Sequence, residues 1–200
     1  MKLYMMRHGQ TFANLEQVYA GQEDVALTEK GRAQAEHLRT LLQPVHFDAV
    51  FSSDLSRAID TQKIALPQWE GIRTPRLREF HVGSLTGKNY KELAKLHGTA
   101  YQKARDYSGF GGENAAMVKA RLSAFLEEIM AEDYENVAVF AHHGTMISML
   151  EIALQADFNR MAVSTDNCSV SVFEYDGSKW ILKLWNYTGH LLRPEELRAL

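Results

Sequence analysis

Short apolar runs alternate along this chain with longer stretches in which apolar residues recur at helical spacing. The clearest run covers residues 137–141, and residues 2–6 and 48–51 form shorter runs of the same kind. The helical period is most regular over residues 118–129. Strands that alternate with helices predict an α/β fold, with a mostly parallel central sheet and helices on both faces.

Capping residues and prolines mark the ends of two predicted helices. Thr28 can cap a helix that runs to about Gln43, where Pro44 stops it. Residues 52–54, Ser-Ser-Asp, are all good cap residues for a second helix, which Pro67 ends. We therefore expect one helix before the run 48–51 and one after it.

The rest of the chain predicts a glycine-rich middle and a closing hairpin. The middle third should consist largely of loops, with one helix near residues 90–107. Residues 168–175 and 179–185 have strand character, and Asp176-Gly177 between them is a two-residue turn signal. The hairpin predicts an antiparallel edge near the C-terminus of the sheet.

Charge and cysteine content limit the classes of function. The 200 residues include 22 Lys and Arg against 25 Asp and Glu, so the formal net charge is −3 and a nucleic-acid partner is not expected. Cys168 is the only cysteine, which suits a reducing cytoplasm. No run approaches the ~18 apolar residues of a membrane span, so no membrane association is expected.

Cationic and imidazole side chains follow three of the predicted strands. Arg7 and His8 end the first, Arg57 lies in the first turn of the helix after the second, and His142 and His143 follow the third. The carboxyl ends of parallel strands meet at one edge of a sheet, so these side chains should converge. Such a cluster requires an anion, and phosphate fits guanidinium groups and helix N-termini best.

A metal site is a less favourable interpretation of the same residues. His8, His81, His142 and His143 are conceivable ligands. No acidic motif supports them, however, and two arginines in the same pocket would repel a cation. We expect neither a metal ion nor an organic cofactor.

Six blocks of the sequence, in order, resemble the histidine phosphatase superfamily, which includes the cofactor-dependent phosphoglycerate mutases. The blocks are RHGQTFAN at 7–14, GQEDVALTEKG at 21–31, SSDLSRA at 52–58, Leu77-Arg78-Glu79 with Gly83 and Gly87, GGE at 111–113, and FAHHG at 140–144. They span nearly the whole chain, so the chain is identified as a member of that superfamily. The resemblance implies a phosphoglycerate mutase-like fold.

The resemblance also implies catalytic roles. His8 is expected to be the nucleophile, which forms a phosphohistidine from its neutral ring. Glu79 is expected to donate the proton to the leaving oxygen and then to activate water. Arg7, Arg57 and His142 are expected to hold the phosphoryl oxygens and to stabilise the transferring group.

Further substrate contacts are implied at Asn14, Thr11, Gly21, Gln22 and His143. Asn14 would add a neutral donor to the phosphate, and Gln22 would lie at the mouth of the pocket. His143 stands where the family often has glycine. Departures of this kind leave the identity of the substrate open without removing a core group.

Residues 80–115 are expected to form a partial lid on a single domain that covers residues 1–200. Tyr90, Phe110 and Met117 are candidates to line the pocket, although Met117 could equally belong to the core. His81 is a surface residue or a pocket residue. These positions would decide which small phosphorylated metabolite the protein accepts.

Three functions remain open at this point. A phosphomonoester hydrolase is favoured, because the stretch between Glu79 and Gly111 is shorter than the insertion that mutase members typically carry. A cofactor-dependent phosphoglycerate mutase is the alternative, and a non-catalytic phospho-ligand binding protein is a third. A homodimer is also possible, since four aromatic residues near the predicted hairpin could form either a contact between subunits or the core. These residues are Phe173, Tyr175, Trp180 and Trp185.

Overall fold

A computed structural model describes residues 1–156 and 163–191. Its centre is a six-stranded sheet with the strand order β3-β2-β4-β1-β5-β6. The strands are β1 (Lys2–Arg7), β2 (Ala49–Ser53), β3 (Ile72–Thr74), β4 (Asn136–Ala141), β5 (Val170–Tyr175) and β6 (Trp180–Tyr187). β3, β2, β4 and β1 are parallel, whereas β5 and β6 are antiparallel to their neighbours, so the predicted mostly parallel sheet with an antiparallel edge is confirmed.

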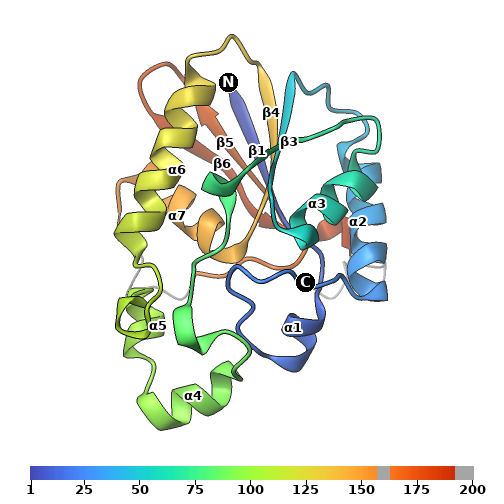
Figure 1. The fold of residues 1–200 in the computed structure, drawn as a ribbon. Coiled ribbons are helices and arrows are strands. Elements are labelled where there is room, and N and C mark those ends of the chain that lie inside the picture. Colours follow the sequence, from blue (N-terminus) through green and yellow to red (C-terminus); the bar gives the residue numbers. More distant parts are fainter. Residues whose placement is uncertain (157–162, 192–200) are drawn as a thin grey trace.

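Helices cover both faces of the sheet. The α-helices are α1 (Phe12–Glu16), α2 (Glu29–Leu42), α3 (Ser56–Ala65), α4 (Tyr90–His97), α5 (Ala100–Ala104), α6 (Ala115–Met130) and α7 (His143–Leu154). Short 3₁₀ turns are η1 (Pro75–Leu77), η2 (Gly83–Leu85), η3 (Ser108–Phe110) and η4 (Gly189–Leu191). Figure 1 shows α6 and α7 on one side of the sheet, α2 and α3 on the other, and α1, α4 and α5 beyond the carboxyl ends of the parallel strands.

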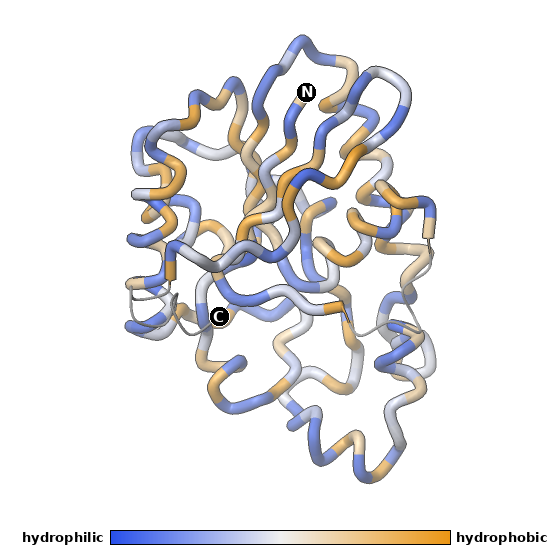
Figure 2. The backbone as a smooth tube through the Cα atoms, turned by 180° about the vertical axis from the view of Figure 1, so that it is seen from behind, coloured by the Kyte–Doolittle hydropathy of each residue, from blue (hydrophilic) through white to orange (hydrophobic). Residues whose placement is uncertain are grey.

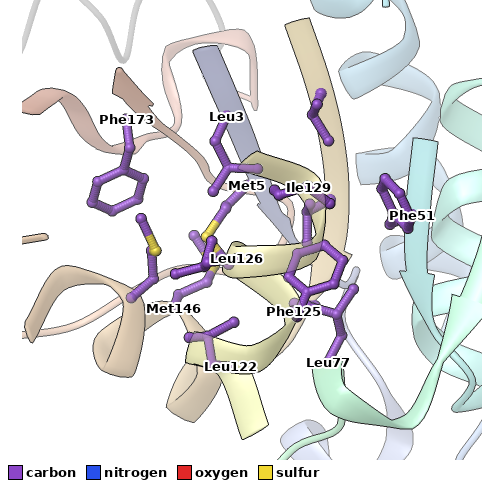
Figure 3. Packing of buried hydrophobic residues seen from close by; sticks show 14 of the residues in the cluster. Leu3, Met5, Phe51, Leu77, Leu122, Phe125, Leu126, Ile129, Met146 and Phe173 are labelled. Carbon is purple, nitrogen blue, oxygen red and sulfur yellow. The ribbon is translucent and has the colours of Figure 1, made fainter. Parts of the chain in front are cut away.

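Two hydrophobic clusters sandwich the sheet because side chains alternate between the faces of each strand. On β1, Leu3 and Met5 pack toward α6 and α7, and Met6 packs toward α2. Figure 3 shows the first cluster, in which Phe125 of α6 meets Phe51 of β2 with ring centroids 5.2 Å apart. In Figure 2 the outer helices alternate between hydrophilic and hydrophobic residues, as expected when only one face is buried.

The two predicted helix caps have different outcomes. Thr28 caps α2 as expected, and its hydroxyl oxygen accepts from the backbone N–H of Gly31 at 3.0 Å. The cap predicted at residues 52–54 is wrong, because α3 has Leu55 at its N-cap and no side-chain cap bond. Ser52 and Ser53 instead belong to β2, and the two carboxylate oxygens of Asp54 accept from Nε and Nη2 of Arg78, each at 2.7 Å. Because its carboxylate is paired with Arg78, Asp54 does not cap α3.

The single helix predicted near residues 90–107 is also wrong. The structure has α4 and α5 with a break at Gly98, whose φ of +70° lies in the left-handed region that favours glycine. α5 then ends at Arg105, which is itself left-handed with a φ of +49°. The predicted hairpin is confirmed, with Gly177 at a φ of +98° between β5 and β6.

Residues 80–115 form a separate small hydrophobic cluster next to the carboxyl ends of the strands. Phe80, Val82, Leu85, Leu93 and Tyr107 are its buried members from this segment. Of the four aromatic residues near the hairpin, Phe173, Trp180 and Trp185 belong to the main body. Phe173 is in the first core cluster, and Trp180 and Trp185 pack against it. Within residues 1–156 and 163–191, no helix is both long and apolar enough to cross a membrane.

Candidate active site

A cavity of about 480 Å³ lies at the carboxyl ends of β1 and β4, where charged residues were expected to converge. Most of the predicted site residues line it, and His142, which does not, has its ring centroid 5.2 Å from that of His8. The predicted residues in its lining are Arg7, His8, Thr11, Asn14, Gly21, Arg57, Glu79, Tyr90 and His143. The sheet therefore brings together residues that are up to 136 positions apart, from Arg7 to His143.

His8 is buried and held in one orientation. Its Nδ1 lies 2.8 Å from the carbonyl oxygen of Gly9, which can only accept, so the ring proton is on Nδ1 and the lone pair is on Nε2. Burial lowers the pKa of His8 well below its usual value, and the cations Arg57 and Arg7 lower it further. A Cβ on Gly9 would meet the carbonyl oxygen of Gly31 at 2.5 Å, so this close turn requires glycine. The result is a neutral imidazole with an available nucleophilic nitrogen.

Arg57 is buried in the first turn of α3 and is fixed by three hydrogen bonds. Its terminal nitrogens donate to the carbonyl oxygens of Gly21 and Glu23 at 2.8 Å, and its Nε donates to Nδ1 of His142 at 3.2 Å. Burial lowers the pKa of Arg57 to about 10, so it remains a cation at neutral pH. The guanidinium thus stays charged beside the cavity.

The contact with Arg57 fixes the tautomer of His142. A guanidinium has no acceptor, so Nδ1 of His142 accepts and its proton lies on Nε2. His142 Nε2 and Arg7 Nε are both buried donors with no partner among the described residues. The rings of His8 and His142 have centroids only 5.2 Å apart. Buried donors without partners are costly, so an acceptor bound within their reach would stabilise the site.

Glu79 lies against the N-terminus of α7. The backbone N–H of Gly144 is 3.1 Å from both carboxylate oxygens, and the N–H of Phe80 donates to Oε1 at 2.9 Å. A Cβ on Gly144 would meet Oε1 at 2.3 Å, so glycine is needed for this close approach. The two amides therefore set the direction in which the carboxyl group of Glu79 points.

The predicted substrate contacts of α1 are arranged by its cap. Thr11 is the N-cap, and its hydroxyl accepts from the N–H of Asn14 at 3.2 Å while Oδ1 of Asn14 accepts from the N–H of Thr11 at 3.1 Å. Oδ1 of Asn14 also accepts from Nδ2 of Asn167 at 3.2 Å. These bonds use the oxygen of Asn14 and leave its amide N–H groups as donors at the cavity.

His143 also lines the cavity, at the first position of α7. Its Nδ1 is 3.0 Å from the hydroxyl of Thr165. Burial, together with the charge of Arg7, lowers the pKa of His143 to about 4. His143 is therefore a neutral group that can exchange hydrogen bonds with a ligand.

Several predicted pocket residues lie elsewhere. Gln22 is not in the cavity lining, because its amide nitrogen donates to the carbonyl oxygen of Glu79 at 3.0 Å, behind the site. His81 is exposed outside the cavity, and the side chain of Met117 is 51% exposed on α6. Phe110 packs on Tyr101, with ring centroids 5.3 Å apart. Of the outer candidates, Tyr90 lines the cavity.

The structure adds functional candidates that sequence reasoning missed. Thr165 accepts from Arg7 through its carbonyl oxygen at 2.6 Å, and Asn167 donates to the carbonyl oxygen of His8 at 3.0 Å. Both lie in the loop before β5, which has no motif of its own. Its position before a strand that pairs with β1 was the only available signal. The segment 80–115 contributes Gln102, Lys103, Arg105 and Tyr107 to the lining.

Comparisons with solved structures define the class of the fold. A mycobacterial glucosyl-3-phosphoglycerate phosphatase superposes with a TM-score of 0.85 at 28% identity, covering 94% of this chain and 99% of that one. The α-ribazole phosphatase of Shigella flexneri superposes with a TM-score of 0.81 at 26% identity, covering 94% and 96%. The chain therefore has a phosphoglycerate mutase-like α/β fold.

The chain belongs to the histidine phosphatase superfamily (branch 1), whose family model matches residues 3–188. Phosphoglycerate mutase-like protein 4 of Arabidopsis thaliana is 32% identical, covering 95% of this chain and 86% of that protein. The metal-independent phosphoserine phosphatase of the same plant is 34% identical, covering 95% and 83%. The family thus comprises phosphatases and mutases that act on small phosphorylated metabolites.

Proposed function

We propose that this protein hydrolyses phosphomonoesters of small metabolites through a phosphohistidine on His8. The observation that carries the proposal is the neutral ring of His8, whose Nδ1 is held by Gly9 and whose ring lies 5.2 Å from that of His142, in a cavity that Arg7 and Arg57 also line. A neutral imidazole attacks phosphorus, whereas an imidazolium cannot. Arg7, Arg57 and His142 then stabilise the charge on the phosphoryl oxygens.

The first step transfers the phosphoryl group to the protein. The lone pair on Nε2 of His8 forms a bond to phosphorus while the ester P–O bond breaks. The leaving oxygen takes a proton from the carboxyl group of Glu79, and the alcohol departs. The carbonyl oxygen of Gly9 accepts from Nδ1 throughout, so it supports the positive charge that develops on the ring.

The second step releases inorganic phosphate. A water oxygen forms a bond to phosphorus as the P–N bond breaks and its electron pair returns to His8. The carboxylate of Glu79 takes the proton from that water, which restores the starting state. Asn14 and His143 add neutral hydrogen-bonding groups to the same phosphoryl site. No step needs a metal ion, because two guanidinium groups neutralise the phosphoryl oxygens.

Two observations support hydrolysis over mutase chemistry. The segment between Glu79 and Gly111 consists of two short helices and turns, and we infer that it acts as a partial lid that admits water. The two phosphatase structures described above match this chain over 96–99% of their own lengths.

The test measures release of inorganic phosphate from a panel of phosphomonoesters and isomerisation of 3-phosphoglycerate, with and without a bisphosphate primer. Hydrolysis without a primer, unchanged by EDTA, is the expected result. Primer-dependent isomerisation that exceeds phosphate release would favour the mutase. Binding of phosphoesters without turnover or labelling of His8 would favour a binding protein instead.

A further inference from the structure

The main chain at Glu79 has no regular secondary structure to hold it. Glu79 lies in the connection between η1 and η2, and residues 78–82 on both sides of it are in neither a helix nor a strand. The N–H groups of Gly144 and Phe80 orient the carboxylate of Glu79, but they do not hold its backbone carbonyl group. Proton transfer requires a heavy-atom separation of about 2.6–3.2 Å, so the position of this connection matters for catalysis.

Arg121 of α6 is hydrogen-bonded to the backbone of the connection that carries Glu79. One terminal nitrogen donates to the carbonyl oxygen of Arg76 at 2.7 Å, and the other donates to the carbonyl oxygen of Glu79 at 3.1 Å. Gln22 donates to the same Glu79 oxygen at 3.0 Å. Arg121 therefore joins two carbonyl groups on either side of the turn that leads to the proposed proton donor.

Glu113 holds Arg121 and the far side of the connection together. Its Oε1 accepts from Nε of Arg121 at 3.0 Å, and its Oε2 accepts from the backbone N–H of His81 at 2.8 Å and from Gln22 at 3.3 Å. The N–H of Glu113 also donates to the carbonyl oxygen of His81 at 2.7 Å. The side chains of Arg121 and Glu113 are only 17% and 15% exposed, so water competes little for this ion pair.

Gly112 allows the approach that these bonds require. A Cβ at this position would meet the carbonyl oxygen of His81 at 2.3 Å. The Gly111-Gly112-Glu113 block thus packs directly on the connection that carries Glu79. Sequence comparison with the superfamily identified this block without assigning it a role.

We propose that Arg121 and Glu113 are positioning residues that hold Glu79 at the distance needed for proton transfer to the leaving oxygen. The inference rests on the proposed function, because it assumes that Glu79 is the proton donor. Neither residue lines the cavity, so neither is expected to touch the substrate. Their effect should pass through the backbone of residues 79–81.

The basicity of the leaving group separates this role from a structural one. A 4-nitrophenolate group leaves with little help from an acid, whereas an alkoxide must be protonated as it departs. Loss of correct positioning should therefore reduce turnover of an alkyl ester much more than turnover of 4-nitrophenyl phosphate. General destabilisation of the protein would reduce both equally.

The experiment measures kcat/KM for glycerol 2-phosphate and 4-nitrophenyl phosphate in Arg121→Met, Glu113→Gln and their double variant. We expect the single variants to lose on the order of tenfold more activity on the alkyl ester than on the aryl ester. The double variant should lose little more than either single variant, because the two residues act as one unit. Glu113→Gln is nearly isosteric and serves if Arg121→Met does not fold.

Two controls keep the outcomes distinct. Glu128 lies on α6, as Arg121 does, and forms an exposed pair with Arg76 of η1. Glu128→Gln breaks that pair and should leave both activities unchanged. Glu79→Gln should show the largest selective loss on the alkyl ester. If Glu79→Gln shows no selectivity, the assignment of Glu79 in the proposed function is wrong. If it does, but Arg121→Met and Glu113→Gln lose both activities equally, the positioning role is overturned.

Discussion

The sheet side of the cavity, where we propose that the phosphoryl group binds, and the segment 80–115 are built in different ways. His8, Arg57 and His142 are at most 4% exposed and extend directly from β1, α3 and the end of β4, inside the main core. In the segment 80–115, α4 has one buried residue, Leu93, and α5 has none, while Leu96 is 76% exposed. The first side is therefore held by the sheet, whereas the segment 80–115 is held by its own small hydrophobic cluster.

This difference assigns separate tasks to the two sides. Groups that stabilise a transferring phosphoryl group must be preorganised, and burial at the ends of strands provides that rigidity. Recognition of the leaving group can vary without loss of the chemistry, and segments with few buried contacts tolerate such variation. We therefore expect substitutions on the sheet side to affect all substrates equally, and substitutions in the segment 80–115 to affect them selectively.

The largest effect is expected for His8→Ala. It removes the attacking nitrogen, so turnover should fall by about 10⁴-fold or more for every phosphomonoester. Phosphate release measures turnover, and labelling that is quenched in alkaline denaturant detects the acid-labile phosphohistidine, which should disappear. His37→Ala, which removes an exposed histidine on α2, is the control. Retention of labelling in His8→Ala would contradict the assignment.

Arg57→Ala should have the next largest effect. It removes a buried cation that also fixes the tautomer of His142, so kcat/KM should fall on the order of 10²–10⁴-fold by the same factor for all substrates. Arg39→Ala removes an exposed arginine paired with Glu36 and should change little. A loss for Arg57→Ala that differs widely between substrates would break the proposed division between the two sides.

Stability should fall at low pH because of the same buried site. Burial lowers the pKa of His8 and His142 well below the usual value and the pKa of His143 to about 4, so these rings stay neutral in the folded state. Below pH 6.5 the unfolded chain binds protons that the folded state does not, so the free energy of unfolding decreases as pH falls.

The free energy of unfolding should change by about 1.4 kcal/mol per pH unit for each histidine whose pKa is lowered in the folded state. Denaturant titrations between pH 7 and pH 4.5 measure this slope. His143→Asn should reduce it by the contribution of one imidazole, about 1.4 kcal/mol per pH unit. If the variant and the unchanged protein had the same slope, the pKa of His143 would not be lowered in the folded state.

The smallest effect is expected in the segment 80–115. Nε2 of Gln102 donates to the hydroxyl of Tyr19 at 2.7 Å at the cavity wall. Gln102→Ala should change kcat/KM by about two- to tenfold, the value of one hydrogen bond, and in a direction that depends on the substrate. A panel of phosphomonoesters with different leaving groups measures this. A uniform loss across the panel would contradict the role of this segment in selectivity.

Sequence patterns predicted the parts of the fold that depend on local periodicity. β1, β4 and α6 lie close to where apolar spacing placed them, α2 lies where the Thr28 cap and Pro44 placed it, and the turn at Gly177 follows from its glycine. Local patterns failed where a distant residue intervened. Asp54 pairs with Arg78 and does not cap α3, a contact across 24 positions that no window of sequence contains.

The candidate site shows the same limit. Arg7, His8, Arg57 and His142 could be selected because each follows a predicted strand, and parallel strands bring their carboxyl ends to one edge. Gln22 was expected at the pocket mouth, but its amide is hydrogen-bonded to the backbone of Glu79. Thr165 and Asn167 became candidates only once β5 was seen to pair with β1.

The order of residues along the chain therefore determined the α/β fold and the identity of the cationic and imidazole groups, because both follow from short-range spacing. Tertiary structure alone decided which tautomers these groups adopt and which of their donors lack partners. It also decided which neighbours hold Glu79 in place. Those properties depend on burial and on hydrogen bonds between residues far apart in sequence, which only the folded arrangement of strands and loops creates.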